Sequence, residues 1–184
     1  MKLETDRIIG LTAMFVAVAS LVALVYQTYL QRQAQHASVL PYLTFVVVSN
    51  PEGTNLAVRN TGIGPAKIEQ MRILYRGKEV ETDPYEFYLL SHPDAVGIGV
   101  DKVLPGRLIP AGEWVRMLEA SGGEKGYTFL PELLKLFEIA EVPRAWYTAT
   151  KTEGGDKAVV EITYASVYGD RWRVRSDRLV PDEL

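Results

Sequence analysis

The feature that most constrains this chain is an uncharged stretch from Ile8 to Gln31, which Arg7 and Arg32 bound on either side. An α-helix rises about 1.5 Å per residue, so some twenty helical residues cover the roughly 30 Å hydrocarbon core of a bilayer. Tyr26 and Tyr29 lie towards its C-terminal end, where amphipathic rings favour the headgroup boundary. The stretch therefore predicts one membrane-spanning helix.

We predict that this helix, about Ile8 to Leu30, is an uncleaved anchor and not a signal peptide. The apolar region of a signal peptide is usually about 7 to 15 residues long and ends at a small-residue cleavage site. Here the one clear pair of small residues, Ala17 and Ala19, falls in the middle of the block, and residues 31–36 after it are polar and bulky.

Positive charge near the helix ends indicates the orientation. Lys2, Arg7 and the α-amino group precede the helix, whereas Arg32 is the one basic residue close behind it. The bias favours an N-terminus in the cytoplasm and a C-terminal domain outside. We expect the inner (cytoplasmic) membrane of a bacterium, crossed once, with a periplasmic domain.

Small residues recur along one side of the predicted helix, at Gly10, Ala13, Ala17 and Ser20. Such residues let two helices approach closely, so this side is a candidate contact with a second copy or with another membrane subunit. The alternative is that alanine is simply a good helix former in lipid, since small-residue motifs recur often without function.

Length and charge bound the rest of the chain. Its 184 residues suit an anchor with linker, residues 1–40, and one further domain, residues 41–184. The formal net charge of −3 is a poor match to nucleic acid, whose binders usually present a strongly basic face. The absence of cysteine excludes disulfides, thiolate metal sites and a cysteine nucleophile.

Short runs rich in β-branched and aromatic residues, separated by Gly and Pro turns, dominate the region after Pro41. One amphipathic helix is predicted, with Pro131 in its first turn. The expected fold is mainly β: an immunoglobulin-like β-sandwich or open barrel with one short helix. The pattern predicts strands over residues 42–48, 55–59, 66–75, 79–81, 113–119, 145–151, 158–168 and 171–175.

Five features occur in order along nearly the whole chain: the N-terminal helix, Leu40–Leu43, Arg59–Ile68, Gly77-Lys78 and Ile162–Asp170. In this combination the chain resembles a loose family of uncharacterised bacterial membrane-anchored β proteins. Members commonly have an acidic residue before the Gly-Lys turn, where this chain has Arg76. The resemblance implies an architecture and a bacterial origin, but no mechanism.

Candidate catalytic and metal-binding residues are sparse. The chain has two histidines, His36 in the linker and His92 in a Ser-His-Pro-Asp turn, and neither has the separated acid and nucleophile that a triad requires. Four carboxylates in the irregular segment 82–97 and just before it lack the regular spacing of a calcium loop; they are Glu81, Asp83, Glu86 and Asp94. We therefore predict no enzyme activity, metal or cofactor.

Arg171, Arg173 and Arg175 alternate with Trp172 and Val174, so a strand here places three guanidiniums on one face. One interpretation is a solvated face partnered by nearby acids such as Asp170 and Asp177. The other is a contact surface for anionic headgroups or an acidic partner, because arginine donates bidentate hydrogen bonds.

These observations favour a membrane-tethered, non-enzymatic binding module of the bacterial envelope, whose partner is a protein, a lipid or an envelope polymer. The alternative is an accessory subunit of a membrane complex that contacts its partners through the transmembrane helix.

Overall fold

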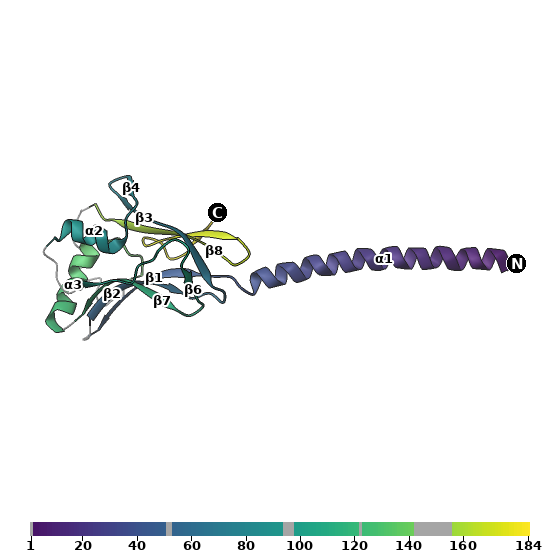
Figure 1. The fold of residues 1–184 in the computed structure, drawn as a ribbon, viewed down its shortest axis with the longest axis horizontal. Coiled ribbons are helices and arrows are strands. Elements are labelled where there is room, and N and C mark those ends of the chain that lie inside the picture. Colours follow the sequence, from purple (N-terminus) through teal and green to yellow (C-terminus); the bar gives the residue numbers. More distant parts are fainter. Residues whose placement is uncertain (1, 51–52, 94–97, 122, 142–155) are drawn as a thin grey trace. The chain divides into compact units, whose positions relative to one another are not determined.

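The computed structural model describes residues 2–50, 53–93, 98–121, 123–141 and 156–184 (Figure 1). The chain divides into two compact units, Met1–Ser38 and Val39–Leu184. The first is a single helix and the second is mainly β-sheet. The predicted strand over residues 145–151 lies outside the described residues.

The first unit is helix α1, Lys2–Ala37, which is longer than predicted at both ends. By length and composition, its segment Arg7–His36 is long and apolar enough to cross a membrane. Hydroxyl groups within it bond to their own helix: Ser20 Oγ donates to Val16 O at 2.8 Å, and Thr12 and Thr28 do likewise. Polar groups satisfied in this way suit an apolar environment, where no water replaces a missing partner.

The second unit contains two antiparallel sheets, which confirms the mainly β prediction. Sheet A has the order β1-β2-β7-β5. Its strands are β1 Leu43–Asn50, β2 Gly53–Asn60, β7 Trp114–Ser121 and β5 Ile98–Gly99.

Sheet B has the order β10-β9-β8-β3-β4, and β6 also pairs with β3. Its strands are β3 Ala66–Tyr75, β4 Lys78–Val80, β6 Leu108–Ile109, β8 Val159–Ala165, β9 Arg171–Arg175 and β10 Asp182–Glu183. The short strands β5, β6 and β10 were not predicted, because two residues carry no recognisable period.

The inner faces of the two sheets share one hydrophobic core. Alternate residues of each strand point inward, as the period of two requires; in β1 these are Leu43, Phe45 and Val47. From sheet B, Ile162 and Tyr164 of β8 meet them, and the Tyr164 hydroxyl accepts a hydrogen bond from Leu43 N at 3.3 Å. The domain is thus two layers around a common interior.

Two helices close one end of these layers (Figure 1): α2, Pro84–Ser91, and α3, Gly123–Leu136. The prediction of an irregular segment at residues 82–97 was wrong for α2. Asp83 accepts a hydrogen bond from Glu86 N as the helix cap, and Pro84 occupies the first turn, so a sequence taken for a chain breaker is a helix start. Pro131 lies inside α3 and not in its first turn.

At the opposite end, the buried side chain of Asn60 ties three segments together. Its Nδ2 donates to Gly64 O at 2.8 Å and to Ile109 O at 2.9 Å. Its Oδ1 accepts from Gly62 N at 3.0 Å and from Tyr42 N at 3.2 Å. We call Asn60 and the loop 61–65 the Asn60 clasp.

The glycines of the Asn60 clasp permit a very close approach of two backbones. A Cβ added to Gly64 would lie 1.9 Å from Val39 O, and one added to Gly62 would lie 2.4 Å from Leu40 O. Ile63 N also donates to Leu40 O at 3.0 Å. The loop therefore packs closely against Val39 and Leu40, the residues with which the domain begins.

Candidate binding site

The outer face of sheet A carries a shallow hollow across β1, β2 and β7. Because Leu43, Phe45 and Val47 point into the core, the intervening Val46 and Val48 of β1 face outward. The hollow has a volume of about 360 Å³, and its lining is Val46, Val48, Arg59, Gly112 and Trp114.

Arg59 and Trp114 stand opposite each other on β2 and β7 in this hollow. Trp114 is 45% exposed, so a large part of its aromatic surface faces solvent. Within the described part of the chain, Arg59 forms no salt bridge. Among the described residues, a cation without an acidic partner therefore lies beside the Trp114 ring and the side chains of Val46 and Val48. We call these residues, with Gly112, the Arg59–Trp114 hollow.

Two residues further along β7, Arg116 points to the same face as Trp114. Its charge is already shared, because its guanidinium lies 3.1 Å from Glu119 and 3.8 Å from Asp101. Among the described residues of this face, Arg59 thus differs from Arg116 in having no acidic partner.

The sequence predicts a strand that contains Trp114, but it does not predict which residue lies opposite this side chain. The available signal was the alternation Trp114-Val115-Arg116-Met117, which places the tryptophan on the polar side of the strand. The partnership with Arg59 was not accessible, since it depends on the register of two strands separated by more than fifty residues.

The three arginines of β9 do point to one face, as predicted, and each has an acidic partner. Arg171 Nε donates to Glu69 Oε2 at 2.8 Å, and Arg175 Nη2 donates to Asp177 Oδ2 at 2.8 Å. The hydrogen bond to Asp177 is the main cause that raises the pKa of Arg175. Asp177 is one of the two acids named in the first interpretation of this face. The other, Asp170, accepts a hydrogen bond from Ser166 Oγ at 3.0 Å.

Arg173 faces the buried carboxylate of Glu161, which is only 2% exposed. The two groups approach to 3.4 Å, while Arg72 on the neighbouring strand β3 approaches the same carboxylate to 2.6 Å. This hydrogen bond to Glu161 is the largest cause that raises the pKa of Arg72. The arginine face of sheet B is therefore a network of paired charges, in contrast to Arg59.

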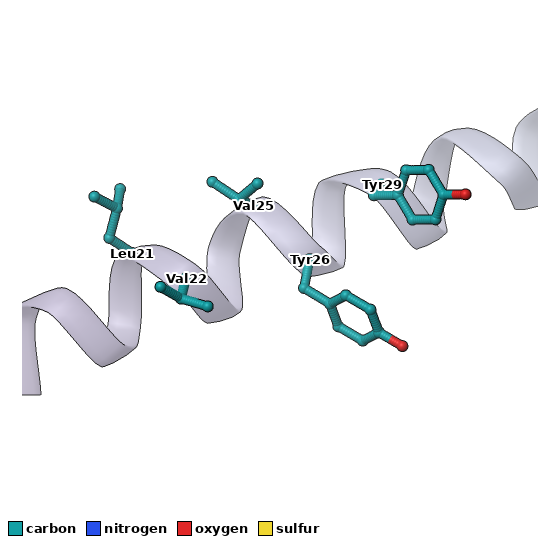
Figure 2. A pocket seen from close by; sticks show the side chains of 5 residues that line it. All are labelled: Leu21, Val22, Val25, Tyr26 and Tyr29. Atoms are coloured by element: carbon teal, nitrogen blue, oxygen red, sulfur yellow. The ribbon is translucent and has the colours of Figure 1, made fainter.

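On α1, a hollow runs along Leu21, Val22, Val25, Tyr26 and Tyr29, which project from the bare helix in Figure 2. At about 100° per residue these side chains lie on a different side from Gly10, Ala13, Ala17 and Ser20. An alanine Cβ at Gly10 would meet no atom within 4 Å. Both sides of α1 are thus uncovered in the isolated chain.

The residues considered for catalysis or calcium binding have local structural roles. His92 caps α2 and stacks on Tyr88, with ring centroids 4.4 Å apart. Asp83 caps the start of α2, and Glu86 accepts from Thr82 at 3.1 Å. Asp94 lies outside the described residues. Among the residues that the structure describes, no group of three His, Cys, Asp or Glu side chains is arranged to hold a metal ion.

Comparison with known proteins adds no assignment: no family model, curated protein or solved structure matches this chain.

The paired charges of sheet B predict unequal costs of substitution. Arg72→Gln should lower the free energy of unfolding by about 3 kcal/mol, because it removes the nearer of the two arginines that pair with the buried Glu161 carboxylate. Arg171→Gln should cost less than about 1 kcal/mol, since that pair is largely exposed. Chemical denaturation of the two variants in detergent measures this difference, and equal costs would contradict the described network.

Proposed function

We propose that this chain is a membrane-tethered, non-enzymatic binding module of the bacterial envelope. In this proposal α1 is the anchor and the Arg59–Trp114 hollow is the binding site. The observation that carries it is the position of Arg59, which forms no salt bridge with the residues that the structure describes, beside the exposed ring of Trp114. The domain is, on the same proposal, an immunoglobulin-like variant of the two-layer sandwich.

The anchor role is supported by the length and apolar character of Arg7–His36. Leaving so many large apolar side chains in water is costly, whereas lipid accommodates them. The positive charges at Lys2 and Arg7 support an N-terminus in the cytoplasm and a domain on the outer side of the inner membrane.

The chemistry of the hollow supports capture of an acidic ligand that carries flat or apolar groups. A guanidinium binds a carboxylate through two parallel hydrogen bonds, and an indole ring offers a broad apolar surface. The ligand that best combines these features is an acidic polysaccharide, in which each ring carries a carboxylate. The hollow offers no acid–base pair or nucleophile for a reaction on such a ligand.

The accessory-subunit alternative, in which α1 makes the contact, draws support from the uncovered small residues Gly10, Ala13, Ala17 and Ser20. The Ser20 hydroxyl is bonded within its own helix, so a contact here would rest on close packing and not on that hydroxyl. Homo-oligomers would form by the same means.

The anchor proposal predicts that the full chain stays in the membrane fraction after carbonate and high-salt washing. Alkaline phosphatase fused after Leu184 should be active in a bacterial host, because that enzyme needs the outer side of the membrane. Recovery of the chain in the soluble fraction would contradict the anchor, and an inactive phosphatase with an active cytoplasmic reporter would reverse the orientation.

The binding proposal predicts that the full chain in detergent micelles binds an oligogalacturonate more tightly than a neutral oligosaccharide of equal length. Arg59→Gln should weaken binding at least about tenfold, because a charge-assisted hydrogen bond contributes about 1.5–3 kcal/mol. Trp114→Ala should weaken it as well. Titration calorimetry measures these affinities.

The matched control is the triple variant Arg171→Gln, Arg173→Gln, Arg175→Gln, which removes more positive charge from the other sheet. Its affinity should stay close to that of the parent chain. Loss of affinity in the triple variant but not in Arg59→Gln would move the site to β9. Equal binding of the acidic and neutral sugars, or preference for polyglutamate, would contradict the ligand class.

A further inference from the structure

Several loops meet at the end of the β domain where the chain arrives from α1; we call this the anchor end. Thr61 N donates to Tyr42 O at 2.8 Å, which places the Asn60 clasp beside the first residues of the domain. Lys67 pairs with Ala165 at the adjoining ends of β3 and β8. The β8–β9 turn, residues 166–170, therefore lies at the same end.

The tips of these loops expose large apolar side chains to solvent. Ile63 is 65% exposed and Val167 is 57% exposed, and Leu40 and Tyr168 are close to half exposed. We call these four side chains the apolar rim. Neither loop needs an apolar residue at its tip for folding, since an exposed side chain adds little to the core.

Backbone and side-chain hydrogen bonds hold both tips in defined positions. Ile63 N donates to Leu40 O at 3.0 Å. In the other turn, Ser166 Oγ accepts from Tyr168 N at 3.1 Å and donates to Asp170 Oδ2 at 3.0 Å. Groups held in this way lose little further conformational entropy when they bind a surface.

We propose that the apolar rim rests in the interfacial layer of the membrane that α1 crosses, an inference that depends on the proposed anchor. The chain connects the two directly: residues 32–37 continue α1 for about 9 Å beyond the uncharged block. The polar layer on one side of a bilayer is about 5–8 Å thick. The end of α1 therefore lies within a few ångströms of the outer edge of this layer, and Leu40 of the apolar rim follows Ala37 by three residues.

The composition of the rim suits this layer. Aliphatic side chains gain by leaving water, and a tyrosine favours the headgroup boundary, where its ring is buried and its hydroxyl stays wet. Contact through the rim would restrict the swing of the domain on its anchor, so that the Arg59–Trp114 hollow stays at a constant distance from the bilayer.

The absence of cysteine in the chain allows this contact to be tested with single labels. Ile63→Cys and Val167→Cys, each carrying an environment-sensitive fluorophore, report on the rim in the full-length protein. The matched control is Leu90→Cys, because Leu90 is 76% exposed and lies on α2, at the end of the domain remote from the anchor end (Figure 1). Circular dichroism confirms that each variant is folded.

The variants are reconstituted in phosphatidylcholine vesicles, with and without lipid that carries a nitroxide near the headgroup. We expect nitroxide lipid to quench the labels at positions 63 and 167 several-fold more than the label at position 90. If the chain floats with the vesicles but all three labels are quenched to the same low extent, the rim contact alone is overturned. A chain that does not float with the vesicles would overturn the anchor and the rim together.

Discussion

The side-chain amide of Asn60 joins the start of the domain to both sheets, and the arrangement of the anchor end depends on it. Its four hydrogen bonds reach Tyr42, Gly62, Gly64 and Ile109, so all of the capacity of a buried amide is used. A buried amide with an unmade bond costs about 1–3 kcal/mol. Because the same loop passes so close to Val39 and Leu40, we expect the site at which the chain enters the domain to be rigid.

This rigidity connects the two proposals. The clasp holds Ile63 against the first residues of the domain, so the apolar rim lies at the end where the chain enters the domain. Strand β2, which ends in Asn60, also carries Arg59 on its outer face. The two outer faces of the domain differ in charge pairing. On sheet B, the arginines of β9 and Arg72 are matched by acids, whereas on sheet A the guanidinium of Arg59 forms no salt bridge with any residue that the structure describes.

Local patterns in the sequence predicted the long helix and most long strands, because hydrophobic length and period-two alternation depend on neighbouring residues. They did not predict α2, since Asp83-Pro84 also suits a turn, and they placed the start of α3 too late. The alternation of β9 located three arginines on one face, but their neutralisation by Glu69 and Glu161 arises from strands distant in sequence. The Arg59–Trp114 pair was missed for the same reason: cross-strand register is a property of the whole sheet.

The central claim, that the Asn60 clasp is a rigid part of the core, is tested most directly by native-state hydrogen exchange of the full chain in micelles. The amides of Tyr42 and Gly62, which donate to Asn60 Oδ1, should exchange only when the whole domain unfolds. Their opening free energies should therefore equal that of Ile162 in the central strand β8. Exchange of Tyr42 and Gly62 through a much cheaper local opening, with Ile162 still protected, would contradict the account.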